Sequence, residues 1–327
     1  MKPGYLLFYL RSRAWIKRAL KRGQQFDLIH QINPLAMRYP CPAAGLRQKL
    51  ILGPLAGSLP TPPGFRKTST DAVWFRKLRN LDRVRLRYDP WLHRGYAEAE
   101  MILGVAPYVE TFLNEVRPKR FEVEGETGVE SISEPPEKKV DGCSPLKLLY
   151  VGRIIRTKGL IDAIKALSLL DKSVRFKLDV IGEGDMSNEC VELARTTGIA
   201  ENICFHGRLP KSRLESFYRA ADLFLFPSFR EPSGNVVFEA LGNGLPVVTT
   251  ECGGPGYVVN ETCGIRVNAS DPESLIAGLK NALEYIGRNR QVLSGWAKGA
   301  TLRMAHLSLW DVKTERMLNR YVQLAKQ

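Results

Sequence analysis

Two carboxylates, Glu231 and Glu239, bracket a polar loop in the stretch 224–256. Glu239 lies inside the short, otherwise apolar helical pattern that follows this loop, where an ionised side chain is costly unless something hydrogen-bonds to it. A buried carboxylate is a poor phosphate ligand but a good acceptor for sugar hydroxyls, so a ribose or hexose fits the pair. The alternative is a helix macrodipole effect of about 0.3–1 kcal/mol, which explains Glu231 but explains Glu239 poorly.

Two cations, Arg153 and Lys158, follow an apolar run over residues 147–152. Lys158 comes just before a second helical pattern, which begins at Leu160. Cations beside a helix N-terminus can neutralise a diphosphate. Lys and Arg are also common on protein surfaces, but a surface role is a weaker explanation for Arg153, which comes directly after a predicted buried strand.

The elements that would position these residues form a βαβ unit. Residues 222–226 and 245–249 are short apolar runs typical of buried parallel strands, and residues 235–243 between them have helical spacing. The loop of such a unit lies at the carboxyl edge of the sheet, where helix N–H groups can bind an anion. Further strands are predicted at 147–152, 178–184, 203–207 and 264–267, with helices at 271–285 and 294–326.

The amino-terminal part predicts a second α/β unit, and a chain of 327 residues suits two such domains. Residues 5–22 have the spacing of an amphipathic helix. Gly53, Pro54 and Gly57 belong to a loop that is expected to begin at Gly53. Strands are predicted at 26–30, 49–53, 99–105 and 120–123.

The segment from Glu231 to Leu241, followed by Gly244-Leu-Pro-Val-Val and Cys252-Gly-Gly-Pro, resembles the donor-site signature of the retaining family-4 glycosyltransferases. The resemblance implies an α/β protein with the GT-B fold, in which two Rossmann-like, doubly wound domains face a cleft. The expected boundaries are 1–140 for a partial acceptor-side domain, 141–300 for the nucleotide-sugar domain and 301–327 for a helix that crosses back. The polar, Pro-rich residues 131–145 predict the linker.

The resemblance also implies a role for each candidate residue in moving a sugar from a nucleotide diphosphate sugar to an acceptor hydroxyl. Arg153 and Lys158 would hold the diphosphate, Glu231 the donor sugar and Glu239 the ribose. The other donor-side residues that it implies are Gly152, Arg208, Leu209, Ser233, Gly234 and Asn235. Gly53, Pro54 and Gly57 would line the acceptor side.

The histidines give a less definite pattern. His30 ends a predicted strand and is either a catalytic residue of the cleft or a structural histidine. Members of the family often have their cleft histidine two residues later, where this chain has Ile32. His93, His206 and His306 have no partners at metal spacing, so no metal site is predicted. With no Asp-x-Asp motif in the chain, a metal-independent reaction without a cofactor is expected. The nucleotide sugar is a substrate, and the choice between UDP and GDP is open.

Positive charge is concentrated at the start of the chain. Residues 1–95 hold 19 Lys/Arg and 4 Asp/Glu, a net charge of +15, whereas the whole chain carries +14. The basic helix 5–22 and the basic segment 76–87 suit an anionic membrane surface, although the helix could equally pack on its own sheet. Nucleic acid is the weaker candidate, because no aromatic-interleaved binding motif accompanies the charge.

The predicted location is cytoplasmic, on the inner face of the plasma membrane, because the six cysteines show no C-x-x-C pairing and no apolar run has the length of a membrane span. A saccharide or lipid-linked acceptor in surface polysaccharide or glycolipid assembly fits this location. Family members usually have more strands ahead of Asp27-x-x-His30, so the amino-terminal domain is expected to be incomplete. The alternative function is therefore a catalytically inactive, donor-binding fragment that acts as a partner subunit.

Overall fold

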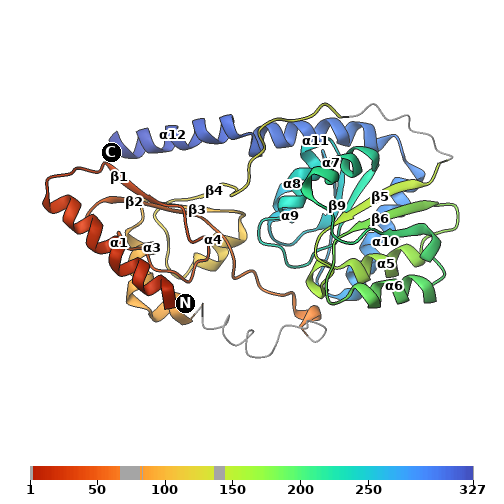
Figure 1. Cartoon of the computed structure of the whole chain (residues 1–327), viewed down its shortest axis with the longest axis horizontal. Coiled ribbons are helices and arrows are strands. Elements are labelled where there is room, and N and C mark those ends of the chain that lie inside the picture. Colours follow the sequence, from red (N-terminus) through yellow and green to blue (C-terminus); the bar gives the residue numbers. More distant parts are fainter. Residues whose placement is uncertain (1–2, 67–81, 83, 136–143, 327) are drawn as a thin grey trace. The chain divides into compact units, whose positions relative to one another are not determined.

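The computed structural model describes residues 3–66, 82, 84–135 and 144–326, which form two compact units (Figure 1). Unit 1 comprises Met1–Leu59, Asp71–Glu126 and Thr314–Gln327, and unit 2 comprises Pro60–Thr70 and Thr127–Lys313. Each unit is built on its own parallel sheet, which confirms the predicted α/β class. The basic segment 76–87 and the linker 131–145 fall in large part outside the described residues.

The sheet of unit 1 has four parallel strands in the order β1-β2-β3-β4. They are β1 (Leu28–Gln31), β2 (Lys49–Leu55), β3 (Met101–Gly104) and β4 (Phe121–Val123), as predicted. The prediction that a loop begins at Gly53 is wrong, because β2 continues through Pro54 to Leu55 with a register shift. Gly53 allows this at φ +120°, since a Cβ there would lie 2.2 Å from the Leu103 carbonyl oxygen.

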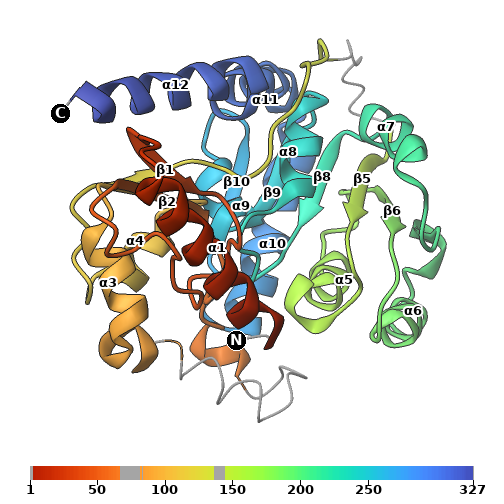
Figure 2. The ribbon, with the colours of Figure 1, turned by 60° about the vertical axis from the view of Figure 1, so that its left-hand side comes forward.

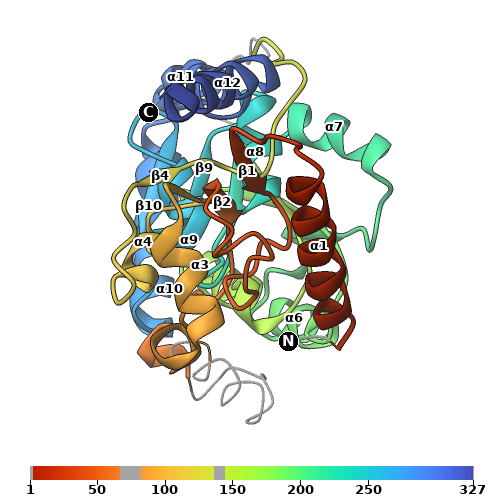
Figure 3. The same ribbon diagram turned by 90° about the vertical axis from the view of Figure 1, so that its left-hand side faces the viewer.

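Helices cover both faces of this sheet: α1 (Pro3–Lys21), α3 (Pro90–Glu98) and α4 (Tyr108–Leu113) lie on one side and α12 (Trp310–Lys326) on the other (Figures 1 and 3). Leu324 of α12 packs against Ile51, Met101 and Leu103 in the core. Lys49 donates a hydrogen bond to the Leu324 carbonyl oxygen over 2.8 Å. These contacts fix α12 on the sheet.

The prediction of a single long helix over residues 294–326 is wrong, because the helical structure is interrupted at Leu309. There α11 (Val292–Ser308) ends and α12 begins, and Leu309 adopts an extended conformation with ψ 126°. Leu309 forms an isolated parallel bridge with Val129, whose N–H donates to Ser308 and whose carbonyl accepts from Trp310. Pairing with a distant segment therefore replaces the helical hydrogen bonds at this point.

The sheet of unit 2 has six parallel strands in the order β10-β9-β8-β5-β6-β7. These strands are β5 (Leu146–Val151), β6 (Phe176–Ile181), β7 (Ile203–Phe205), β8 (Leu223–Phe226), β9 (Val247–Thr250) and β10 (Gly264–Val267). One face carries α5 (Leu160–Ser168), α6 (Ser187–Thr196) and α10 (Pro272–Arg288) (Figure 2). The other carries α7 (Lys211–Ala220), α8 (Asn235–Gly242), α9 (Gly253–Val258) and α11. This is a doubly wound, Rossmann-like arrangement.

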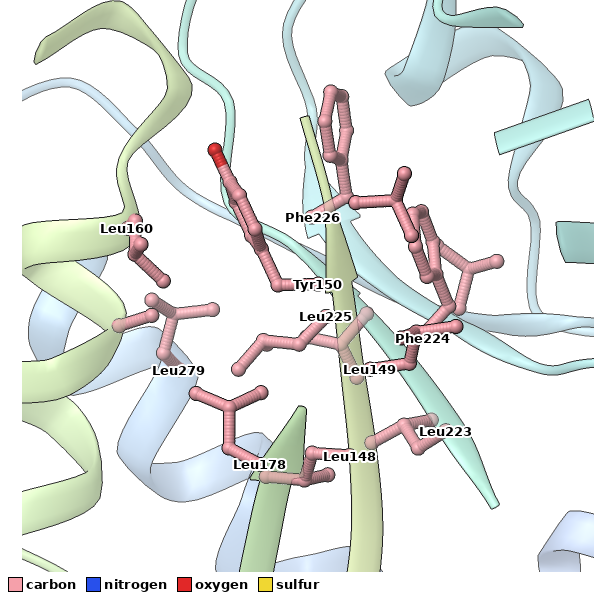
Figure 4. Packing of buried hydrophobic residues seen from close by; sticks show 14 of the residues in the cluster. Leu148, Leu149, Tyr150, Leu160, Leu178, Leu223, Phe224, Leu225, Phe226 and Leu279 are labelled. Atoms are coloured by element: carbon pink, nitrogen blue, oxygen red, sulfur yellow. The ribbon is translucent and has the colours of Figure 1, made fainter. Parts of the chain in front are cut away.

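The core of unit 2 joins the central strands to the helices. Leu148, Tyr150, Leu178 and Leu225 are all at most 1% exposed. Figure 4 shows side chains of β5, β6 and β8 packed together with Leu160 of α5 and Leu279 of α10. The central strands thus provide a rigid base for the loops at their carboxyl ends.

Phe65 extends this core from a segment that the sequence places in the first domain. It lies in a short 3-10 helix (Pro63–Phe65) and is fully buried. Its ring stacks on Phe229 with 3.8 Å between centroids, and the Arg156 guanidinium lies 5.1 Å and 5.2 Å from the two ring centroids. Arg156 in turn donates to both carboxylate oxygens of Asp162.

Candidate functional site

The candidate site lies where the strand order of unit 2 reverses. The chain moves outward in one direction from β5 to β6 and β7, and in the other from β8 to β9 and β10, while β5 and β8 are neighbours. Parallel sheets bind ligands outside the carboxyl ends of their strands at such a switch point. The predicted β8-α8-β9 unit is confirmed, and the loops 152–159 and 227–234 both begin at this edge.

These two loops are in close contact. Gly159 has φ +72°, and a Cβ there would lie 2.1 Å from the Pro227 carbonyl oxygen. The Ser228 hydroxyl donates to the Thr157 carbonyl oxygen over 3.0 Å. Only glycine at position 159 combines this backbone conformation with this approach, so the two loops form one surface.

Lys158 and Glu231 connect the two loops through an ion pair. Their side chains are 9% and 20% exposed, and Lys158 Nζ lies 5.7 Å from the centroid of the Phe226 ring. A charge removed from water to this extent requires a partner. The sequence assigned the two residues to different parts of one ligand, and the structure places them in contact.

Arg153 follows β5 at the same edge, as predicted, and is exposed. Its carbonyl oxygen accepts a hydrogen bond from the Tyr150 hydroxyl over 3.0 Å, and burial raises the pKa of Tyr150. Among the described residues, the Arg153 guanidinium has no hydrogen-bond or ion-pair partner. Gly152 is held by a hydrogen bond from its N–H to Ile181. Of the two predicted cations, Arg153 is thus exposed to solvent and Lys158 is already paired.

Glu239 lies on α8 and is half-buried, with 28% of its side chain exposed, so the expectation of a buried carboxylate is wrong. The Tyr218 hydroxyl donates to Glu239 Oε2 over 3.1 Å, and Lys211 Nζ lies 3.6 Å from Oε1. Burial and the nearby Glu239 charge raise the pKa of Tyr218, which keeps its hydroxyl a donor. Sequence reasoning missed Tyr218, because nothing in the local pattern links α7 to α8.

The α8 N-terminus lies beside Glu231. Gly234 precedes the helix at φ 83°, and no side chain caps it, so the first N–H groups of α8 are available to an anion. A Cβ on Gly254 would lie 2.2 Å from the Ser233 carbonyl oxygen, and the Gly254 N–H donates to the backbone carbonyl oxygen of Glu231. The Asn235 side-chain oxygen accepts from Thr127 over 2.5 Å. Close backbone packing at Ser233 and a side-chain hydrogen bond at Asn235 thus hold the predicted residues 233–235 in place.

The turn after β7, which contains the predicted donor-side residues Arg208 and Leu209, makes hydrogen bonds within the protein. The Arg208 N–H donates to Glu183 over 3.3 Å, and the Gly207 carbonyl oxygen accepts from Gly182 over 2.8 Å. The Arg208 side chain is exposed, whereas Leu209 packs against the core. The turn therefore has a defined shape, with Glu183 as a partner that the sequence did not reveal.

The remaining candidates belong to unit 1. His30 uses both ring nitrogens, with Nδ1 2.7 Å from the Tyr321 hydroxyl and Nε2 2.7 Å from the Gly53 carbonyl oxygen. A carbonyl can only accept, so Nε2 carries the proton and the tyrosine donates to Nδ1. Burial lowers the pKa of His30. These features are typical of a neutral, structural histidine, the second of the two roles left open by the sequence.

The acceptor-side candidates Gly53, Pro54 and Gly57 differ in their surroundings. Gly53 and Pro54 belong to β2, whereas Gly57 follows it at φ +91° with its N–H bonded to the Tyr108 hydroxyl over 3.1 Å. Ile32, at the position of the second family histidine, is 53% exposed. A Cβ placed on Gly57 would meet no atom within 4 Å.

The expectation that His206 has no partner at metal spacing is wrong. Asp179, Cys204 and His206 offer ligand atoms that all lie within 4.8 Å of one another. The sequence signal was the i, i+2 spacing of Cys204 and His206 on a strand, which places both on one face. Their third partner comes from the neighbouring strand and could not be recognised without the sheet order.

Residues 135–292 match the family Glycosyl transferases group 1. The chain is 29% identical over 175 residues to an uncharacterized glycosyltransferase of Methanocaldococcus jannaschii, covering 53% of this chain and 44% of that protein. It is 39% identical over 141 residues to the lipopolysaccharide glucosyltransferase WaaG of Escherichia coli, covering 42% and 37%. The chain thus spans less than half the length of these curated relatives.

Solved structures extend the likeness to the fold of most of the chain. Anabaena HepE in complex with UDP superposes with a TM-score of 0.62 at 16% identity, covering 85% of this chain and 73% of that one. At this identity, the match establishes the fold alone. Residues 135–292 are thus similar to the glycosyl transferases of group 1, on a chain with the GT-B fold.

Proposed function

We propose that the chain is a glycosyltransferase that moves a sugar from a nucleotide diphosphate sugar to an acceptor hydroxyl with retention of anomeric configuration. The observation that carries the proposal is the Lys158–Glu231 ion pair at the switch point, beside the exposed Arg153 and the uncapped α8 N-terminus. Cations and N–H groups at one sheet edge suit a diphosphate, and the carboxylates suit sugar hydroxyls.

The proposed reaction needs no nucleophile from the protein. The acceptor oxygen forms a bond to the anomeric carbon on the face from which the diphosphate leaves, and the acceptor proton passes to the leaving phosphate oxygen. Arg153, Lys158 and the α8 N–H groups stabilise the negative charge that builds on that oxygen. Protein cations would take the place that a metal ion occupies in other sugar transferases.

Each carboxylate has a distinct proposed task. Glu239 accepts from the ribose hydroxyls, and the Tyr218 hydroxyl holds the carboxylate in place. Glu231 accepts from the donor sugar while it remains close to Lys158. For the nucleotide, UDP is the first choice to test because it occupies the HepE structure, with GDP as the alternative.

The surface of α1 supports a lipid-linked acceptor at an anionic membrane. Leu6, Leu7, Phe8, Leu10 and Trp15 are 43–57% exposed, and Arg11, Lys17 and Arg18 lie among them on the helix. An amphipathic helix of this composition binds at the interface of anionic bilayers. A pocket of about 800 Å³ adjoins it, lined among others by Trp15, Ile16, Phe26, Leu28, Arg11 and Arg18. No described helix has both the length and the apolar character that crossing a bilayer requires.

One experiment separates this function from a donor-binding subunit without activity. Nucleotide sugars are incubated with the protein, with and without acceptor saccharides, and the anomeric protons are followed by NMR. An enzyme releases or transfers the sugar, and the first product keeps the anomeric configuration of the donor. Binding without any turnover would favour the inactive subunit, and an inverted product would contradict retention.

A further inference from the structure

A second cluster of reactive side chains lies on β6 and β7, at one side of the six-stranded sheet. β7 is the edge strand of the six-stranded sheet, and it pairs with β6 in a register that places Asp179 opposite Cys204. His206 follows two residues after Cys204. Because side chains alternate along a strand, these three residues share one face of the sheet.

The contacts within this cluster fix the histidine tautomer. His206 Nε2 lies 2.6 Å from Asp179 Oδ1, and an ionised carboxylate can only accept, so Nε2 carries a proton. Nδ1 faces Cys204, with 3.9 Å between Nδ1 and Sγ. The Phe217 ring of α7 packs edge-on against the imidazole at 4.9 Å between centroids. The ring is thus held on two sides with its free lone pair directed at a thiol.

This arrangement matches half of a tetrahedral metal site. With a Zn–S distance of about 2.3 Å and a Zn–N distance of about 2.0 Å, the sulfur and nitrogen ligands of one Zn²⁺ lie about 3.6 Å apart. The separation of 3.9 Å between Cys204 Sγ and His206 Nδ1 needs little adjustment. A carboxylate on the second imidazole nitrogen is the partner that metal-binding histidines usually have.

We propose that Cys204 and His206 bind a soft divalent cation of the Zn²⁺ class, with Asp179 orienting the imidazole. A thiolate and an imidazole select Zn²⁺ or Co²⁺ over Mg²⁺ or Ca²⁺, which prefer oxygen ligands. Cys204 is exposed, and the Asp179 and His206 side chains are 42% and 25% exposed, so a cation can enter. Water or an added ligand completes the coordination. None of these three residues is among those assigned to sugar transfer, although His206 immediately precedes the turn 207–209, which contains the donor-side candidates Arg208 and Leu209.

Cobalt titration of the full chain, free of any affinity tag and of thiol reductants, tests the proposal. One Co²⁺ per chain should bind and give the charge-transfer absorption of a cobalt thiolate. Cys204→Ser should abolish this band, and Asp179→Asn should weaken Co²⁺ binding about 10–100-fold, as loss of an orienting carboxylate does. His93→Asn, which alters an exposed histidine of α3, should leave the titration unchanged.

Thiol alkylation gives an independent measurement. Zn²⁺ should slow alkylation of Cys204, followed by peptide mass spectrometry, in the native chain but not in His206→Ala. Circular dichroism of each variant checks that it is folded. The proposal is overturned if the native chain gives no cobalt thiolate band, if Cys204→Ser retains the band, or if Zn²⁺ leaves the rate of Cys204 alkylation unchanged.

Discussion

Lys158 and Glu231 form an ion pair between the loops that follow β5 and β8. Both side chains are largely buried, so each charge needs the other as its ion-pair partner. In the proposed reaction the same pair faces the donor, where the cation stabilises the leaving diphosphate. The pair therefore links the stability of unit 2 to its chemistry, and the two contributions can be separated by mutation.

Removal of one partner should destabilise unit 2. We expect Lys158→Met to lower the free energy of unfolding by about 1.5–3 kcal/mol, the value of a hydrogen bond to a charged group, because Glu231 remains without its partner. Urea unfolding followed by circular dichroism measures the change. Lys165→Met on the exposed face of α5 is the matched control and should change stability by no more than about 0.5 kcal/mol.

The double variant Lys158→Met/Glu231→Gln tests the coupling. Because it leaves no unpaired charge, its loss of stability should be smaller than the sum of the losses measured for Lys158→Met and Glu231→Gln, by a coupling energy of about 0.5–3 kcal/mol. It should nevertheless transfer no sugar at a measurable rate. Additive effects of the two single changes on stability would show that the ion pair does not exist in solution, and full activity of the double variant would remove both residues from the mechanism.

Glu239 and Tyr218 should act on donor binding as a pair. Glu239→Gln is expected to reduce donor affinity or turnover about 10–100-fold, because hydrogen bonds to a charged acceptor are lost. Tyr218→Phe removes only the hydroxyl that positions this carboxylate and should have a smaller effect in the same direction. Donor titration by calorimetry measures both. Glu215→Gln, on the exposed face of α7, should bind the donor normally, and a normal affinity of Glu239→Gln would refute the assignment.

His30 should make stability depend on pH with a defined sign. Burial lowers its pKa in the folded state, so as pH falls through about 6.5 the unfolded chain binds the proton first. The stabilising contribution is therefore present above that pH and is lost as pH falls through the lower folded-state pKa. Unfolding free energies between pH 5 and 8, compared with those of His30→Gln, measure it. An equal slope in both proteins would assign the pH dependence elsewhere.

The exposed apolar face of α1 should be required for membrane binding. The double variant Leu7→Glu/Leu10→Glu should no longer sediment with anionic vesicles, because it removes apolar area that would be buried in the bilayer and adds negative charge. Raising the salt concentration should weaken binding of the native chain. Leu302→Glu is the matched control, since Leu302 is 72% exposed on α11. Equal binding of all three proteins, or no binding by the native chain, would exclude this surface.

The sequence was sufficient for the features that depend on local pattern. Short apolar runs predicted the strands, and the helical spacing of residues 235–243 between two such runs predicted the β8-α8-β9 unit. Features that join distant segments could not be read in this way. The helix is broken at Leu309 because this residue forms a β-bridge with Val129. Phe65 is buried in the core of unit 2 because its ring stacks on Phe229 and lies against the Arg156 guanidinium.

The candidate site shows the same division. The residues at the ends of β5 and β8 were predicted because apolar runs precede them. The hydrogen-bond partners of two other candidates were missed, because these partners come from distant parts of the sequence. Tyr218 donates to Glu239, and Glu183 accepts from Arg208. The burial of Glu239 was overestimated for a related reason. In a helix as short as α8, exposure is set by neighbouring elements that the local pattern does not contain.

Calorimetric titration with UDP, GDP and their sugars tests the central claim most directly. The account predicts that one nucleotide family binds the native chain at a single site, and that Lys158→Met and Glu239→Gln each weaken this binding about tenfold or more. Lys165→Met and Glu215→Gln should bind as the native chain does. Absence of binding to the native chain, or equal affinity in all five proteins, would contradict the account.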